Sequence, residues 1–201
     1  MSILSHVHGG YVHARRVRIL RRCLAELIPQ QSSVLDVGCG DGMLGSLITA
    51  DRPDLQYMGI DVLVRDDTRI PVTRFDGRHI PFADQSWEFV MFVDVLHHTE
   101  DPMILLREAA RVAKKGVLIK DHLLDAFLAG SRLRFMDTVG NRRHGVALPF
   151  NYWRKEQWLS AFRELELLVN SWDGNLRLYP GPADWVFGRS LHFVGRLDLK
   201  K

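Results

Sequence analysis

Two spacings of apolar residues alternate along this chain of 201 residues. Short apolar runs rich in β-branched and aromatic residues are typical of buried strands, and five occur, at residues 32–38, 55–61, 72–76, 86–96 and 116–121. Apolar residues three or four positions apart predict helices at 42–50 and 101–113, the second capped by Asp101 with Pro102 in its first turn. Because these strands are too apolar to leave one face in water, the alternation predicts a parallel sheet with helices on both faces.

A basic amphipathic helix is predicted within residues 1–30, before the first strand. Its apolar stripe consists of Val17, Leu20, Leu24, Leu27 and Ile28. The opposite side carries five arginines, Arg15, Arg16, Arg18, Arg21 and Arg22. We interpret this side as a solvated face, with contact to an anionic membrane surface or an acidic partner as the alternative. The start of the chain, with His6, His8 and His13, is expected to be flexible.

Composition narrows the class of protein. With 46% hydrophobic and 25% charged residues, the chain fits one globular domain spanning 1–201. It shows neither a secretion signal nor a run of ~20 apolar residues, so we expect a soluble, cytoplasmic protein. Cys23 and Cys39 are too few for a disulfide framework and lack the paired spacing of a zinc site, and no metal is expected. The net charge of +3 reflects mainly the arginine run.

The first strand leads into a glycine-rich run, VLDVGCGDGMLG at 34–45. Its backbone N–H groups and the following helix start predict a cradle for an anion or a polar head group. A Walker phosphate loop is excluded because no Lys-Ser or Lys-Thr pair follows. A dinucleotide fold stays a rival, since Gly40, Gly42 and Gly45 satisfy G-x-G-x-x-G with Asp61 further on.

Three carboxylates lie on consecutive predicted strands and favour another ligand. Asp36 lies two residues before the first glycine, where it would repel a pyrophosphate but accept from an ammonium. Asp61 ends the second strand and could accept both hydroxyls of a ribose. Asp76 ends the third and could accept from an exocyclic amine. Together they describe a ligand with an amine, a ribose diol and an adenine, and no phosphate.

Four motifs carry a family resemblance: VLDVGCGDG, GID, FDGRHIPFADQSWEFV and DVLHHTEDP. In this order and at these distances they resemble the class I S-adenosylmethionine-dependent methyltransferases, in particular the branch of the ubiquinone and menaquinone biosynthesis enzymes. The resemblance implies one doubly wound, Rossmann-like domain with a mostly parallel seven-stranded sheet and an antiparallel last strand. It also implies a cofactor-binding half at 31–121 and a substrate-side insert with the C-terminal half at 122–190.

The resemblance assigns residues to each part of the cofactor, with S-adenosylhomocysteine as product. The methionine end is assigned to Asp36, Gly38, Cys39, Gly40 and Gly42, together with Leu44. The ribose is assigned to Asp61 and Val62, and the adenine to Asp76 and Gly77. The other side of the cofactor is assigned to Asp94, Val95 and His97.

Methyl transfer requires mainly an aligned nucleophile, with a base if the acceptor is a hydroxyl or a carbon. Candidate catalytic residues beyond the strand ends are His97, His98, Asp121 and His122, with His144 as a further candidate later in the chain. A His98 that merely packs or caps a helix is an equal alternative.

The long connection at 122–153 is predicted to bind the acceptor, as a lid. In it, His144, Asn151 and Tyr152 are expected to reach the acceptor, while Arg142 and Arg143 attract an anionic one. The alternative is a solvated turn followed by helix-capping residues, which would leave recognition to a second polar loop at 178–190.

A small molecule is the favoured acceptor. No Asn-Pro-Pro-Tyr or Asp-Pro-Pro-Tyr motif of amino-group DNA methyltransferases is present, nor the paired glutamates of protein arginine methyltransferases, nor a recognisable RNA-binding module. Two other functions remain open: a non-catalytic protein that binds the cofactor or its product, and a nicotinamide-dependent oxidoreductase.

Overall fold

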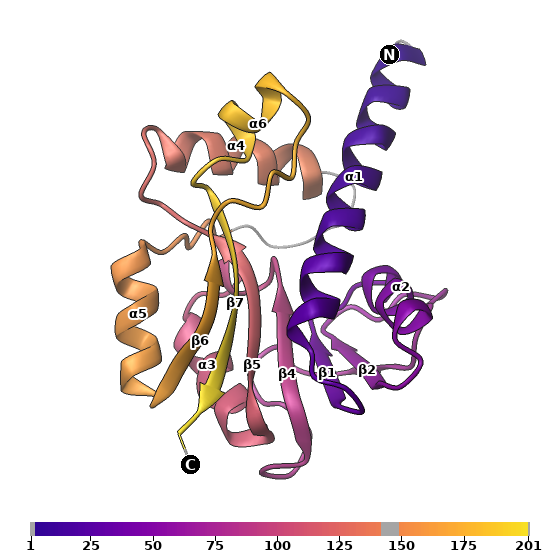
Figure 1. Ribbon diagram of the computed structural model, residues 1–201, viewed down its shortest axis with the longest axis vertical. Helices are drawn as coiled ribbons and strands as arrows, with labels where there is room; N and C mark the ends of the chain where they lie inside the picture. The colour runs from indigo at the N-terminus through magenta and orange to yellow at the C-terminus, as the bar shows by residue number, and fades with distance from the viewer. Residues whose placement is uncertain (1–2, 142–148, 201) are drawn as a thin grey trace.

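The computed structural model describes residues 3–141 and 149–200, with side chains at 12–139 and 149–200, and places all seven strands in one sheet (Figure 1). The strands are β1 (Ser33–Val37), β2 (Gln56–Asp61), β3 (Val72–Arg74), β4 (Trp87–Val93), β5 (Ala113–His122), β6 (Leu167–Asp173) and β7 (His192–Leu199). They lie in the order β3-β2-β1-β4-β5-β7-β6. All neighbours from β3 to β5 are parallel, whereas β7 runs antiparallel to β5 and β6. The predicted fold class is confirmed.

Helices cover both faces of this sheet. They are α1 (Ile3–Leu27), α2 (Met43–Asp51), α3 (Pro102–Val112), α4 (Ala129–Asn141), α5 (Lys155–Glu164) and α6 (Pro182–Phe187), with a short 3₁₀ helix η1 (Leu96–His98). Asp101 caps α3 by accepting from Met103 N at 2.9 Å, with Pro102 in the first turn, as the sequence predicts.

Each face of the sheet has its own hydrophobic core. On one face, Leu24 of α1 and Ile48 of α2 pack in one cluster with Met91 of β4. On the other, Leu106 of α3 and Trp158 of α5 pack in a second cluster with the opposite side of the sheet. Strand residues therefore alternate between two buried faces, which explains why the strands read as continuous apolar runs.

The carboxyl ends of the parallel strands meet at one edge of the sheet. Figure 1 shows α4 and α6 above this edge, near the end of β5, and α1 extending past the sheet on the same side. In a parallel sheet this is the edge where ligands bind, so the fold places the glycine run and the ends of β2, β4 and β5 there together.

Some elements depart from their predicted bounds. The strand expected at 86–96 ends at Val93, because Asp94 takes a left-handed conformation with φ of +57° and the chain turns into η1. The helix α1 begins at Ile3 and includes the start that was expected to be flexible. The loop expected at 178–190 contains α6. Edge strand β6 matches none of the apolar runs because its side chains are mostly exposed. Among the described residues, no helix has the length and apolar character to cross a membrane.

Candidate functional site

The glycine loop, residues 38–42, turns tightly at the end of β1. Gly38, Gly40 and Gly42 all have positive φ, of +76°, +61° and +73°, which favours glycine at each. A Cβ on Gly38 would lie 2.6 Å from Val95 Cγ2, so Gly38 also lets the turn after β4 approach. A Cβ on Gly40 would meet nothing within 4 Å. The backbone of Gly40 therefore borders open space, where a ligand has room.

Gly45, at the start of α2, makes room for a tyrosine. A Cβ there would lie 2.5 Å from Tyr57 Cε1, and the Tyr57 hydroxyl donates to Asp36 Oδ2 at 2.9 Å. Asp36 is only 3% exposed, and burial raises its pKa to about 7. The carboxyl is therefore held in place by Tyr57, close in sequence to the glycine loop, and it takes up a proton near neutral pH.

Asp61 joins the end of β2 to the glycine loop. Its Oδ2 accepts from Gly40 N at 2.8 Å and its Oδ1 accepts from Leu63 N at 2.9 Å. Val62, the next residue, is about half exposed. The carboxylate is thus fixed in place by backbone donors on both sides.

Asp76, after β3, forms a turn. Its Oδ1 accepts from His79 N at 2.7 Å and Arg78 N at 2.8 Å, and these backbone donors lower its pKa. Gly77 follows with φ of +81°.

Two other residues assigned to the methionine end pack inside the protein. Leu44 packs in the cluster that contains Leu24 of α1 and Ile48 of α2, and the Cys39 side chain lies against Gly59. Burial raises the pKa of the Cys39 thiol, which suits a packing role and not that of a nucleophile.

A cluster of polar side chains, buried except for the partly exposed Asp94, lies around the carboxyl ends of β4 and β5. We call it the polar cluster; it comprises Asp94, His97, Lys120, Asp121, His122, Asp137, Tyr152 and His192. Buried charges require partners, and in the polar cluster each carboxylate has at least one cationic or hydrogen-bonding neighbour.

One half of the polar cluster is built around Lys120. Its ammonium is paired with Asp94 and lies 3.3 Å from His192 Nδ1. His192 Nε2 lies 2.8 Å from the carbonyl oxygen of Phe187, which can only accept, so Nε2 carries the proton and Nδ1 accepts from Lys120. Burial and the lysine hold the pKa of His192 well below its usual value. Arg16 of α1 lies 3.5 Å from the other oxygen of Asp94.

The other half is built around Asp121. Its Oδ1 lies 2.6 Å from His97 Nδ1 and accepts from His122 N at 2.7 Å, while its Oδ2 accepts from Leu96 N at 3.1 Å. Burial acts to lower the pKa of His97, but Asp121 and Asp137 raise it to about 10. Through these contacts Asp121 fixes η1 and His97, and its expected role toward an acceptor stays a prediction.

Other predicted site residues are also engaged within the protein. His122 is buried, and burial together with His97 lowers its pKa. His98 is only partly buried; burial and His97 lower its pKa to about 4. Asn151 Nδ2 donates to the carbonyl oxygens of Thr99 at 3.2 Å and Glu100 at 2.9 Å.

Two residues of the long connection that were predicted to reach the acceptor, Asn151 and Tyr152, make contacts within the protein. Tyr152 is buried and its hydroxyl donates to Asp137, so it supports the polar cluster instead of extending toward an acceptor. Asn151 fastens the turn after η1. The predictions for Arg142, Arg143 and His144 concern residues outside the described part of the chain.

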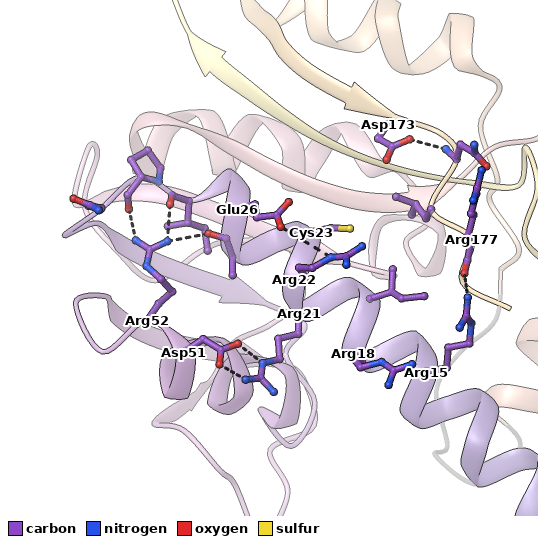
Figure 2. Close-up of a pocket in the computed structure, with 17 residues that line it drawn as sticks. Arg15, Arg18, Arg21, Arg22, Cys23, Glu26, Asp51, Arg52, Asp173 and Arg177 are labelled. Carbon is purple, nitrogen blue, oxygen red and sulfur yellow. Dashed lines mark hydrogen bonds and ion pairs between the residues drawn. The ribbon is translucent and has the colours of Figure 1, made fainter. Parts of the chain in front are cut away.

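A cavity of about 1030 Å³ lies along α1, away from these residues. Its walls come from α1, the end of α2 and residues 173–177, and none of the glycine loop or polar cluster lines it. Figure 2 shows Arg21 turned to Asp51 and Arg15 to the backbone carbonyl of Arg177. The arginine side of α1 is therefore only partly the solvated face that its sequence predicts, because these two residues bind the rest of the protein.

A family model described as a methyltransferase domain matches residues 10–174. The chain belongs to this methyltransferase family. The match confirms the resemblance to class I methyltransferases and, at the level of the family, an enzyme of this class with S-adenosylmethionine as its cofactor.

Relatives of the methyltransferase cover about half of its chain. An uncharacterized methyltransferase of Mycobacterium sp. (strain KMS) is 31% identical over 112 residues, which are 52% of this chain and 44% of the relative. The 27-O-demethylrifamycin SV methyltransferase of Amycolatopsis mediterranei (strain S699) is 28% identical over 124 residues, 53% of this chain and 45% of its own. A tRNA U34 carboxymethyltransferase of Nautilia profundicola is 30% identical over 108 residues, which are 47% of this chain and 35% of the relative. The chain thus spans less than half the length of these relatives.

Solved structures agree on the fold. The PH0226 protein from Pyrococcus horikoshii OT3 superposes with a TM-score of 0.67 at 17% identity, covering 94% of this chain and 91% of that one. The likeness extends over nearly the whole length of both chains.

Three members of the polar cluster have no counterpart among the predicted site residues of the methyltransferase: Lys120, Asp137 and His192. Lys120 carried the clearest signal, because a lysine inside an apolar parallel strand needs a buried partner. Asp137 and His192 come from α4 and the start of β7, and only the folded chain brings them to the end of β5.

Proposed function

We propose that this methyltransferase transfers the methyl group of S-adenosylmethionine to a small-molecule acceptor. The observation that carries the proposal is the row of carboxylates Asp36, Asp61 and Asp76 on neighbouring strands, of which Asp61 accepts from the backbone N–H of Gly40. Asp36 lies in β1, Asp61 ends β2, and Asp76 lies just beyond β3, and these three strands are adjacent and parallel. Such a row suits a ligand with an ammonium, a ribose diol and an adenine amine, and it disfavours the pyrophosphate of a nicotinamide cofactor.

The cofactor's parts follow from this row. Asp36 and the backbone of Gly38 and Gly40 hold the methionine end. Asp61 accepts from the ribose hydroxyls, because each of its oxygens has accepted one N–H and keeps a lone pair. Asp76 and its neighbours hold the adenine. The close approach of Val95 to Gly38 brings the turn after β4 next to the methionine end, so the methyl group faces the polar cluster.

The proposed chemistry is an in-line displacement at the methyl group. The methyl on a sulfonium is already activated, so alignment of the nucleophile supplies most of the acceleration. His98 is the partly exposed histidine of η1, and its low pKa keeps it neutral near pH 7, in the form that accepts a proton. Asp121 and His122, which are buried, support it through η1 and the end of β5.

A small molecule is proposed over a nucleic acid. The rifamycin relative acts, by its name, on a small molecule, whereas another relative is named for tRNA. Basic residues that bind nucleic acid must be free to reach phosphates. Arg21 and Arg52 are instead paired with Asp51 and Asp54, which supports the smaller acceptor.

The first experiment measures cofactor binding by titration calorimetry with S-adenosylhomocysteine and, separately, with NAD. We expect only S-adenosylhomocysteine to bind. Asp61→Ala is expected to lose on the order of 2–3 kcal/mol of affinity, because a charge-assisted contact to two hydroxyls is removed. Asp66→Ala is the matched control, an exposed carboxylate five residues along the same turn. Equal affinity in both variants would remove the ribose assignment.

The second experiment tests the acceptor. Methyl-labelled S-adenosylmethionine is incubated with the protein and either a metabolite extract or total RNA. We expect label only in the metabolite fraction. Label in RNA would replace the small-molecule proposal, and cofactor binding without any label would favour a non-catalytic binding protein.

A further inference from the structure

Three side chains beside the proposed methyl position converge on one point. Nitrogens of His97 and His98 and a carboxylate oxygen of Asp137 all lie within 4.8 Å of one another. His97 Nε2 is 3.3 Å from Asp137 Oδ2. His98 Nδ1 is buried and makes no hydrogen bond to any described residue, and the buried His97 Nε2 faces the Asp137 carboxylate. Two imidazole nitrogens and a carboxylate oxygen this close together are the donor atoms of a metal site, in which the ion takes the place of the proton between His97 and Asp137.

The surroundings orient these donors. His97 Nδ1 lies 2.6 Å from Asp121 Oδ1, and a carboxylate only accepts, so Nδ1 carries the proton. Histidines that bind metals usually donate their second nitrogen to a carboxylate in this way, which fixes the ring and points the other nitrogen at the metal. Asp137 in turn accepts from the Tyr152 hydroxyl. Both the histidine and the carboxylate are therefore held from behind.

A second group of donor atoms nearby, from Asp94, His97 and His122, is less suited to a metal. Asp94 already pairs with the ammonium of Lys120, which would repel a cation. The nitrogen of His97 nearest to His122 is Nδ1, which is bound to Asp121. The choice between the two groups falls on His97, His98 and Asp137.

We propose that His97, His98 and Asp137 bind one divalent transition-metal ion. Two imidazoles and one carboxylate suit Zn²⁺ and its neighbours in the first transition row better than Mg²⁺ or Ca²⁺, which prefer oxygen donors. Three protein ligands leave a position for a further oxygen ligand. Resting on the proposed function, this position would hold an acceptor hydroxyl and lower its pKa, so that its proton passes to water before the oxygen takes the methyl group. With the metal bound, His98 serves as a ligand and the metal replaces it as the group that activates the acceptor.

The test is metal binding by the full chain. The protein is dialysed against a chelator, then titrated with Zn²⁺ by calorimetry, with bound zinc counted by mass spectrometry. We expect one ion per chain. Replacement by Co²⁺ gives visible absorption that reports the ligand geometry, a readout that does not depend on methyl transfer. If wild-type protein retains no zinc after buffer exchange, the proposal is wrong, and His97 serves only as a charged bridge between Asp121 and Asp137.

Variants assign the ligands. His98→Ala is expected to weaken Zn²⁺ binding at least about tenfold, and Asp137→Asn, which keeps the side-chain shape, does the same if the first variant fails to fold. His79→Ala is the matched control, since His79 is exposed and its partner Glu108 lies on α3. A combined replacement of His6, His8 and His13 by alanine controls for zinc held by the N-terminal histidines; loss of binding there would overturn the proposal.

S-adenosylhomocysteine affinity is measured on the same samples. Zinc bound without cofactor affinity supports the metal site and removes the proposed methyl transfer. Cofactor affinity without bound zinc removes the metal site and leaves the proposed methyl transfer in place.

Discussion

Single glycines of the glycine-rich run at 34–45 have separable roles. Gly38 and Gly45 admit Val95 and Tyr57, so their lack of a side chain serves internal packing. Gly40 admits nothing from the protein, and we assign its open side to the cofactor. Position in the glycine run alone does not distinguish these roles, because the neighbours come from other strands and turns.

The role of Gly40 can be tested with a matched pair of variants. Gly40 and Gly181 both have positive φ, +61° and +47°, and a Cβ on either would meet nothing within 4 Å. Alanine at each should therefore cost about 1–3 kcal/mol of stability from backbone strain alone, with the larger cost at Gly181, whose ψ of −129° lies outside the left-handed α region. Only Gly40→Ala is expected to lose S-adenosylhomocysteine affinity in calorimetry, because its methyl group enters the ligand's space. Equal affinities would place the cofactor elsewhere.

Asp36 predicts a pH dependence of cofactor binding. Its pKa in the folded protein is raised to about 7, so the carboxyl is protonated below that pH and ionised above it. If the ionised form accepts from the ammonium of the cofactor, affinity rises with pH through 7, by up to about tenfold per unit on the acidic side. Calorimetric titrations of S-adenosylhomocysteine between pH 5.5 and 8.5 measure this.

Asp36→Asn supplies the control, because an amide does not titrate and its affinity should be flat over the same range. The linked effect on folding has the opposite sign. A carboxyl with a raised pKa in the folded state favours folding at low pH, and this contribution is lost as pH rises through about 7. A rising wild-type affinity together with an equally rising variant would point to another group.

At the scale of elements, the ends of β4 and β5 depend on each other through charge. Lys120 of β5 neutralises Asp94, the residue at which β4 turns into η1. Burial acts to raise the pKa of Asp94, but Lys120 and other nearby cations hold it well below its usual value, whereas burial lowers the pKa of Lys120. The lysine is fully buried and directly follows the apolar stretch Val117–Ile119 of β5. Such a pair is costly to break, because the remaining charge is left without its partner.

Lys120→Met is accordingly expected to lower the free energy of unfolding by about 3–5 kcal/mol in urea denaturation. Adding Asp94→Asn should restore part of this loss, because the uncompensated carboxylate is removed. Lys115→Met is the control, since Lys115 lies on the same strand but is half exposed beside Glu88. A double variant no more stable than Lys120→Met would show that the pair is not the cause.

For the whole molecule, α1 is an integral part of the domain. Leu24 is fully buried in the core on the α1–α2 face, and Arg16 reaches Asp94 near the ligand edge. Leu24→Ala is expected to cost about 2–5 kcal/mol of stability, measured by urea denaturation. Arg22→Ala, on the exposed side of the same helix, should cost little. A small effect of Leu24→Ala would mean that α1 is a detachable arm.

The sequence allowed the sheet and the carboxylates along its edge to be predicted, but not how the polar cluster is assembled. Apolar runs and strand-end residues such as Asp36 and Asp61 are local signals, and a parallel sheet aligns them without further information. Asp137 and His192 reach Lys120 and His97 only because α4 folds over the sheet edge and β7 returns antiparallel to β5. Such proximity depends on tertiary packing, which spacing along one chain does not encode.

The carboxylate of Asp61 holds the peptide N–H of Gly40 and is also assigned to the ribose. One rigid group would then be shared by the two halves of a single ligand. Adenosine, by binding that carboxylate, would restrain the Gly40 peptide that it holds and so prepare the loop for a free amino acid such as homocysteine, and homocysteine would do the same for adenosine. We therefore expect the two fragments to bind cooperatively, each tightening the other by the same factor, since coupling between two sites is reciprocal.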